Sequence, residues 1–392
     1  MNPEDRTVPT TESAAGDDQN AGGPASEFHT GRRNFISGAG ALGAAAAIPL
    51  VMAPRWARAD KWPDRAITAV VMYAAGGGTD VVLRQLAGEM AKSVGWDVNV
   101  INKPGGVGAV ATSFVLGKPA DGYWWLGAAN FNKFVRVMGG SDSVAWTDWQ
   151  FYQAANSLAS WSVRTESPFK SFEEVVAYAK KNPGKLTIST SGTGGIWHEL
   201  AAIIAQAAGI NIRYVPYKGG KPATLAGLQG ETDIAGGGVH EHIEFIRAGK
   251  LRCLQQTGAK DITVEGVGVL PSVGNFLPAL KPALPVGGNY NIVLRRDTPL
   301  EILREVEKVF VAAVKAPGFQ EMAKKRYFDI DIRTGEAADR RAAQLEVLTA
   351  ATFAEVKDQL GKTPKSAAEL GLPTPAEFDK WWPPKGYKPR MA

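Results

Sequence analysis

The chain has 392 residues, of which 45% are hydrophobic and 21% are charged. This length and composition suit a folded protein of two domains, and they exclude a disordered, collagen-like or disulfide-stapled chain. The 44 basic and 39 acidic residues are interspersed and leave a net charge of +5, so no nucleic-acid partner is expected.

The first 59 residues have the features of an export signal. Residues 1–30 are polar and predict disorder. Arg32-Arg33 precedes an uncharged Gly/Ala-rich stretch, and Ala57-Arg58-Ala59 fits a small-x-small cleavage site. The pattern predicts a twin-arginine signal peptide that is cleaved near Ala59, and hence a periplasmic protein. The alternative is a retained anchor, because the uncharged stretch is long enough to span a bilayer.

The remaining chain alternates predicted strands and helices. The apolar run 67–73 predicts a buried strand, and helical spacing follows from Val82. Capping boxes predict helix starts at Ser171, with Glu174, and at Thr298. Further strands are predicted at 98–101, 123–128, 186–190, 214–216, 232–235 and 251–257. Strands separated by helices imply an α/β fold with parallel-rich sheets covered by helices on both faces.

Two glycine-rich loops at equivalent positions predict two α/β domains that face each other across a cleft. The first domain is predicted over residues 60–162 and 289–360, and the second over 163–288. A tail rich in proline follows at 361–392. We expect it to wrap the surface irregularly, with Trp381-Trp382 anchoring it by apolar burial.

The two loops, Ala75 to Asp80 and Thr190 to Gly195, each lie between a strand and a helix. Glycines allow successive N–H groups to point outward, and the helix N-terminus adds a partial positive charge. The loops therefore predict sites for a phosphate or a carboxylate, with Ser191 and Thr193 as hydroxyl donors. The alternative is that the glycines only make tight turns.

Three side chains near these loops are candidates for ligand contact. Asp80 caps the first helix, binds a ligand, or does both. Trp197 lies in the first turn of the helix after the second loop, so we expect it to face a ligand with an apolar or planar body. Lys218 either attracts an acidic ligand or is an ordinary surface lysine.

Sequence motifs for catalysis, cofactors and metals are not satisfied. Val81 stands where the dinucleotide fingerprint requires its third glycine. No phosphate-binding P-loop, metalloprotease or nucleophile-elbow motif is present. His240-Glu241-His242 is interpreted as a solvated first helical turn rather than a metal site, and Cys253 as a packed thiol. We therefore expect no enzyme activity, no cofactor and no metal.

Ordered sequence blocks along the chain resemble the periplasmic solute-binding proteins of tripartite tricarboxylate transporters, the Bug family. Besides the two loops, the blocks are Trp62-Pro63-Asp64-Arg65-Ala66-Ile67, Asn102-Lys103-Pro104-Gly105-Gly106, Pro119-Ala120-Asp121-Gly122-Tyr123, Asn182-Pro183-Gly184-Lys185-Leu186, Pro216-Tyr217-Lys218-Gly219-Gly220, Ala248-Gly249-Lys250-Leu251-Arg252 and Arg295-Arg296-Asp297-Thr298-Pro299.

The resemblance implies a two-domain periplasmic-binding-protein-like fold that closes on its ligand like a Venus flytrap. It also implies a monomeric receptor that passes a small carboxylate to a membrane permease of one large and one small subunit. The ligand-binding residues that it implies, with Trp197 and Gly237 added for this chain, are Tyr73, Ala75, Gly76, Gly77, Gly78, Thr79, Asp80, Ala129, Asn130, Ser191, Gly192, Thr193, Gly194 and His198.

Three features depart from the family pattern. Gly236-Gly237-Gly238 stands where members commonly have an acidic residue, which predicts a roomier pocket. Trp197 stands in a stretch that is usually filled by small polar residues and changes the lining. A dicarboxylate or an aromatic carboxylate with a second polar end would satisfy both loops. The tail from Lys362 onward has no counterpart in the family.

Two other functions remain open from sequence alone. The loaded receptor could signal to a membrane sensor kinase instead of a permease. An exported enzyme acting on acidic substrates would need a catalytic pair, for which His198 and Asp80 are the candidates.

Overall fold

The computed structural model describes residues 62–391. The predicted signal peptide and its cleavage site near Ala59 lie outside the described residues. Among residues 62–391, no helix has both the length and the apolar character needed to cross a membrane. By their contacts the described residues belong to one compact unit, and the predicted division at 163 and 288 stays a prediction.

Thirteen strands lie within the described residues. They are β1 (Ile67–Val71), β2 (Val98–Asn102), β3 (Trp124–Ala129), β4 (Trp149–Asn156), β5 (Ala159–Arg164), β6 (Thr187–Thr190), β7 (Arg213–Pro216), β8 (Ala235–Gly238), β9 (Leu251–Gln256), β10 (Ile262–Val264), β11 (Gly268–Leu270), β12 (Asn289–Arg295) and β13 (Asp329–Arg333).

The α-helices of the described residues are α1 (Gly78–Val94), α2 (Ala109–Leu116), α3 (Lys133–Val137), α4 (Ala145–Asp148), α5 (Phe172–Lys181), α6 (Ile196–Ala208), α7 (Gly220–Gln229), α8 (Val239–Arg247), α9 (Val273–Phe276), α10 (Leu300–Lys315), α11 (Pro317–Arg326), α12 (Gly335–Glu355), α13 (Ala367–Leu370) and α14 (Phe378–Trp381).

Six strands form the larger sheet, in the order β13-β4-β12-β3-β1-β2. β1 runs parallel to β2 and β3, whereas β12 runs antiparallel to β3 and β4. β4 leaves this sheet towards the smaller sheets and β12 returns from them, so these neighbours run in opposite directions. The sheet is therefore mixed rather than parallel-rich as predicted, because β13 also runs antiparallel to β4. We call it, with α1–α4 and α10–α12, lobe 1.

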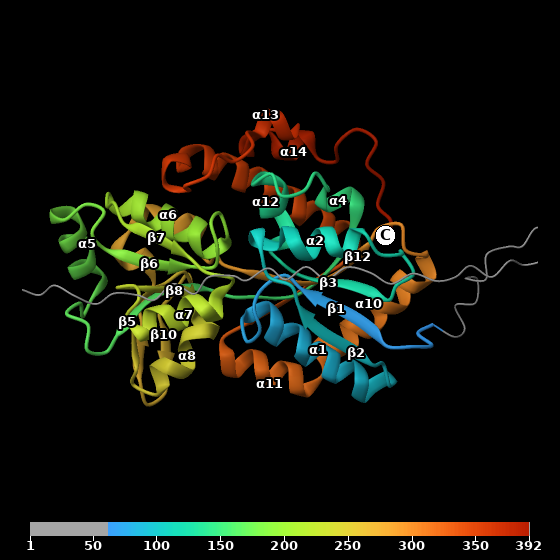
Figure 1. Cartoon of the computed structure of the whole chain (residues 1–392), viewed down its shortest axis with the longest axis horizontal. Coiled ribbons are helices and arrows are strands. Elements are labelled where there is room, and N and C mark those ends of the chain that lie inside the picture. The colour runs from blue at the N-terminus through green and yellow to red at the C-terminus, as the bar shows by residue number, and fades with distance from the viewer. Residues whose placement is uncertain (1–61, 392) are drawn as a thin grey trace, which may run out of the picture. The chain divides into compact units, whose positions relative to one another are not determined.

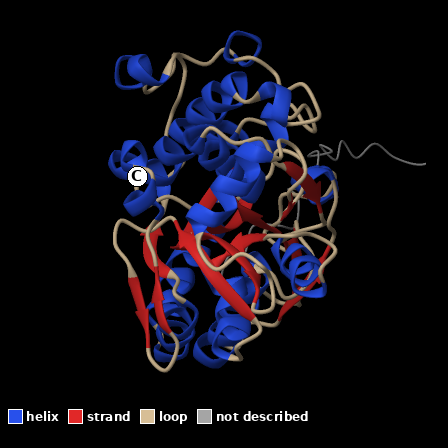
Figure 2. Cartoon of the chain, turned by 90° about the vertical axis from the view of Figure 1, so that its left-hand side faces the viewer, coloured by secondary structure: helices blue, strands red, loops and turns tan. Residues whose placement is uncertain are grey.

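Alternate side chains of β1 belong to two different apolar cores. Ile67, Ala69 and Val71 pack with α1, α10 and α11, whereas Val70 packs on the opposite face with α2, α3 and α12. Figure 1 shows α1 and α11 on one side of the strands and α2 and α12 on the other, and Figure 2 shows strands between helices. The expected α/β class is confirmed.

The strands β5–β11 form three smaller sheets, which with α5–α9 we call lobe 2. β5 lies between β8 and β9 and is antiparallel to both, while β6 and β7 pair in parallel. Trp161 on β5, Phe172 on α5 and Ile204 on α6 meet in one buried core. The Ser171 side chain accepts the Glu174 N–H at 3.3 Å, so the expected N-cap of α5 is confirmed.

The chain crosses between the lobes twice, at Ser157 and at Gly287-Gly288, and the two crossing segments lie side by side. The Ser157 N–H donates to the Gly288 carbonyl at 2.8 Å. A side chain at Gly287 would overlap the Ser157 carbonyl, which explains why glycine stands at that position.

Two sequence expectations about helix ends and the tail differ from the structure. Pro299, not Thr298, caps α10, and no side chain bonds there, so the predicted capping box is wrong. The tail is not irregular throughout, because α13 and α14 form within it. Trp381 packs edge-on against Trp146 with ring centroids 5.8 Å apart, so the expected apolar anchor is confirmed for this tryptophan.

Candidate functional site

The first glycine-rich loop is held in place by Asp80. The Asp80 carboxylate accepts the Gly76 N–H at 2.9 Å, Arg84 Nε at 3.0 Å and Asn102 Nδ2 at 2.9 Å. Burial works to raise the pKa of Asp80, but these hydrogen bonds and the Arg84 charge hold it below its usual value. Both carboxylate oxygens are thus engaged within lobe 1, and Asp80 fixes the loop that precedes α1. The predicted capping role is wrong, because Gly77 is the N-cap of α1 and no side chain bonds there.

The second loop is held by His198 in a defined tautomer. His198 Nδ1 accepts the Gly194 N–H at 3.1 Å, and its Nε2 lies 3.1 Å from the Gln359 carbonyl. Because a carbonyl only accepts, Nε2 must carry the proton and donate. Burial lowers the pKa of His198 to about 4, so the ring is neutral at pH 7.

A small cavity of about 20 Å³ lies where the lobes meet, and we call it the inner cavity. Its walls come from the starts of α1, α6 and α7, from the ends of β1 and β3, and from α8 and β12. The lining residues are Tyr73, Gly77, Gly78, Thr79, Ala129, Asn130, Ser191, Ile196, Trp197, Gly220, Glu241, Gly288 and Tyr290. The structure therefore brings together eight of the residues that the sequence predicts for the ligand site.

Several polar groups around the inner cavity have no partner among residues 62–391. The Tyr73 hydroxyl, Asn130 Nδ2 and the Ser191 hydroxyl are buried and make no hydrogen bond to these residues. Asn130 Oδ1 accepts the Asn289 N–H at 3.1 Å, so Nδ2 of Asn130 points away from Asn289. Buried donors are costly to leave unpaired, so these three indicate a place for a ligand or a water.

The backbone at the end of β3 is strained beside this cavity. Asn130, Phe131 and Asn132 have φ values of 55°, 51° and 58°. A bulky residue such as phenylalanine rarely adopts this left-handed conformation, and strain of this kind clusters at functional sites. It follows that the packing around Phe131 holds Asn130 in position.

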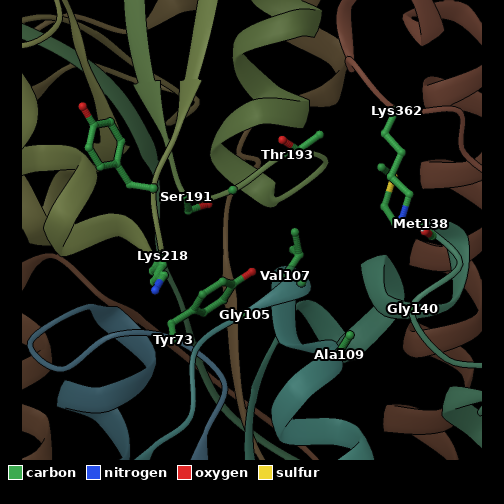
Figure 3. A pocket seen from close by; sticks show the side chains of 13 residues that line it. Tyr73, Gly105, Val107, Ala109, Met138, Gly140, Ser191, Thr193, Lys218 and Lys362 are labelled. Carbon is green, nitrogen blue, oxygen red and sulfur yellow. Dashed lines mark hydrogen bonds between the residues drawn. The ribbon is translucent and has the colours of Figure 1, made fainter. Parts of the chain in front are cut away.

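A larger cavity of about 410 Å³ adjoins the inner one, and we call it the outer chamber (Figure 3). The two share Tyr73 and Ser191. The remaining lining residues of the outer chamber are Gly105, Gly106, Val107, Ala109, Met138, Gly140, Gly192, Thr193, Tyr217, Lys218 and Lys362. Lys218 and Lys362 line the outer chamber from different parts of the chain, so two of its sides each carry a positively charged side chain.

The segment after α12 contacts both lobes, which the sequence did not predict. Gln359 binds His198 through its carbonyl and accepts the Tyr214 hydroxyl at 2.8 Å through its side chain, both in lobe 2. Lys362 Nζ donates to the Met138 carbonyl of lobe 1 at 2.7 Å. The tail thus supports the second loop and supplies part of the outer chamber.

Six predicted site residues line neither cavity: Ala75, Gly76, Asp80, Gly194, His198 and Gly237. Ala75 and Gly76 are exposed, while Asp80, Gly194 and His198 shape the two loops.

The prediction of a roomier pocket beside Gly237 is wrong. A Cβ atom at this position would lie 2.6 Å from His242 Nε2 and 3.1 Å from Glu241 Oε2. Side chains from the start of α8 fill the space that the glycines leave.

The predicted solvated first turn of α8 is wrong, because His240, Glu241 and His242 are all buried. The two histidines point to different partners. His240 Nε2 lies 3.2 Å from the Tyr290 hydroxyl, whereas His242 Nδ1 lies 2.7 Å from the Ser160 hydroxyl. Over residues 62–391, no group of three or more His, Cys, Asp or Glu side chains is placed to hold a metal ion. Burial raises the pKa of Cys253 to about 12, so it remains a thiol.

The buried histidines predict a pH-dependent stability. Burial lowers the pKa of His242 to about 4 from 6.5, so its contribution is present above pH 6.5 and is lost as the pH falls towards 4. At 1.36 kcal/mol per pKa unit, the loss is about 3 kcal/mol. We expect the unfolding free energies of the wild type and His242→Gln, measured in urea, to converge by this amount between pH 6.5 and 4. A constant difference would contradict the buried neutral ring.

Comparisons with known proteins agree with this architecture. The family described as "Tripartite tricarboxylate transporter family receptor" matches residues 82–347. The "UPF0065 protein in gbd 5'region" of Cupriavidus necator is 30% identical over 305 residues, which cover 76% of this chain and 89% of the relative.

Solved structures of periplasmic binding proteins also resemble this chain. The periplasmic binding protein BugD is 25% identical with a TM-score of 0.69, and the match covers 76% of this chain and 99% of BugD. Rpa4515 of R. palustris, solved with adipate, shares the fold at 24% identity and a TM-score of 0.66, over 78% of this chain and all (100%) of that one. The expected two-domain periplasmic-binding-protein fold is confirmed. Because the family match spans most of the sequence, the chain belongs to the tripartite tricarboxylate transporter family receptors.

Proposed function

We propose that this protein is a periplasmic receptor that binds a small carboxylate between its lobes and delivers it to a two-subunit membrane permease. The observation that carries the proposal is the set of unpaired donors, Tyr73, Asn130 and Ser191, between the inner cavity and the outer chamber. Membership of the receptor family and the adipate bound by Rpa4515 support a carboxylate as the ligand.

The acid group of the ligand fits the outer chamber best. The second loop precedes the N-terminus of α6, and Ser191, Gly192 and Thr193 line the chamber. Hydroxyl donors and the positive end of a helix favour an anion there. Lys218 and Lys362 add positive charge on two sides of the same space.

Ligand capture requires the lobes to separate and close. The paired crossings at Ser157 and Gly287-Gly288 are the short segments about which such a motion takes place in our proposal. The closed arrangement buries the ligand between residues of both lobes, and this arrangement is the one that the permease recognises. The receptor acts as a monomer in this scheme.

Thermal unfolding against a panel of carboxylic acids tests the proposal. A ligand at about 100 times its dissociation constant adds about 2.7 kcal/mol of stability to the folded state. We expect a raised melting temperature with one class among aliphatic diacids, hydroxy acids, amino acids and aromatic acids. No stabilisation by any acid, for protein that native mass spectrometry shows to be free of ligand, would overturn the proposal.

The two lysines of the outer chamber give a second prediction. Replacing Lys218 and Lys362 together by glutamine removes both cations, and we expect the affinity for the stabilising acid to fall by about tenfold at low salt. Lys365→Gln is the matched control, because Lys365 lies in the same segment and pairs with Asp142 at 2.7 Å. Titration calorimetry at two salt concentrations measures the effect, and equal affinities for the three proteins would contradict the assignment.

A further inference from the structure

Glu241 places a carboxylate of the protein itself inside the inner cavity. It lies in the first turn of α8, is 7% exposed, and its Oε2 accepts the Gly238 N–H at 2.9 Å. Its Oε1 lies 3.5 Å from where a Cβ of Gly77 would stand, and a side chain at Gly220 would overlap the carboxylate. A lobe 2 acid thus lies against the starts of α1 and α7, where helix N-termini attract negative charge.

The charge of Glu241 is incompletely balanced by the protein. Within the described residues no lysine or arginine forms an ion pair with it, and His240 Nε2 is 3.6 Å from its Oε1. Lys221, the one basic side chain of α7, interacts with Glu241 by charge but has its Nζ over the Phe245 ring at 4.5 Å. Burial works to raise the pKa of Glu241, but His240, the Gly238 N–H and His242 hold it below its usual value. An ionised acceptor therefore faces the cavity.

The charge that faces the inner cavity restricts the groups that can enter it. The cavity volume of about 20 Å³ exceeds the about 10–15 Å³ that one water needs, so a small polar group can enter. A carboxylate carries a negative charge, so Glu241 disfavours it as a neighbour. A hydroxyl or an ammonium group matches Glu241, because each can donate a hydrogen bond to it.

Asn130 distinguishes how a hydroxyl and an ammonium group would each bind in the inner cavity. Asn130 Nδ2 is an unpaired donor on the wall of the same cavity. A hydroxyl can donate to Glu241 and accept from Asn130, whereas an ammonium can only donate but adds an opposite charge.

We propose that Glu241 determines specificity by admitting only a hydrogen-bond-donating group to the inner cavity, while the acid group of the same ligand binds in the outer chamber. The ligand class is therefore a carboxylate with a hydroxyl or ammonium at its other end, not a dicarboxylate. The inference rests on the proposed carboxylate receptor and narrows its ligand.

Chain-matched ligands test the inference by titration calorimetry. One series is adipate, 6-hydroxyhexanoate and 6-aminohexanoate, and a shorter one is succinate, 4-hydroxybutyrate and 4-aminobutyrate. For the wild type we expect the hydroxy or amino member of a series to bind at least about tenfold more tightly than the diacid. Glu241→Gln keeps an oxygen that can accept the Gly238 N–H, and we expect it to reduce this preference to less than about threefold.

Glu244→Gln is the matched control, because Glu244 lies on the same helix, is exposed and pairs with Arg247 at 3.0 Å. It should keep the wild-type preference, and circular dichroism should show all three proteins folded. A wild type that prefers the diacid, or a preference that Glu241→Gln leaves unchanged, overturns the inference and leaves the carboxylate receptor standing. If none of these acids nor any acid of the wider panel binds, the proposed function falls and the inference falls with it.

Discussion

Replacing Gly78 by valine is expected to lower carboxylate affinity by about 10- to 100-fold. A Cβ atom at this position would overlap His240 Nε2 of lobe 2 and lie 2.5 Å from the Tyr290 hydroxyl. Overpacking of this kind costs about 1–3 kcal/mol, and here the clash includes a contact that exists only when the lobes meet. The variant should therefore favour separated lobes and lose the inner cavity. Titration calorimetry with the acid that stabilises the wild type measures the loss.

Gly88→Ala is the control for this prediction. Gly88 lies on the same helix α1, and a Cβ atom there meets nothing within 4 Å. Alanine should raise helix stability slightly and leave affinity unchanged. Gly77 would be a weaker test than Gly78, because its Cβ position has ordinary contacts at 3.5 Å. Unchanged affinity in Gly78→Val would show that ligand binding does not need the lobes to meet at α1.

Replacing Lys133 by methionine is expected to lower the unfolding free energy by about 3–5 kcal/mol. Lys133 of α3 and Glu199 of α6 form an ion pair at 3.0 Å between the lobes, and both side chains are nearly fully buried. The Thr349 hydroxyl of α12 also donates to Glu199, at 2.6 Å. Removing the lysine alone leaves a buried carboxylate without its counter-charge, which is more costly than the pair itself.

A double variant separates this penalty from lost packing. Lys133→Met combined with Glu199→Met removes both charges and fills similar volume, so we expect it to recover most of the lost stability. Urea unfolding of the wild type, both single variants and the double variant measures the coupling. Additive losses would contradict a strong interaction between the two side chains.

Much of the fold was predictable from local sequence, and the failures have physical causes. The strands at 98–101, 186–190, 214–216 and 251–257 were predicted close to β2, β6, β7 and β9, because each is a short apolar or β-branched run. β4 was missed because its residues are nearly all buried and show no alternation. Without β4 and β12, the sequence could not reveal that the sheet is mixed.

The sequence determined the two glycine loops, because the loop conformation and the helix that follows depend on neighbouring residues. It also located Tyr73, Gly77 to Thr79, Ala129, Asn130, Ser191 and Trp197, which line the inner cavity. Only the tertiary structure decided which of these face that space and which, like Asp80 and His198, are engaged in holding the loops. Only the tertiary structure brought in Glu241, Tyr290 and the Lys362 tail, because contacts between residues far apart in the chain depend on how the two lobes pack together.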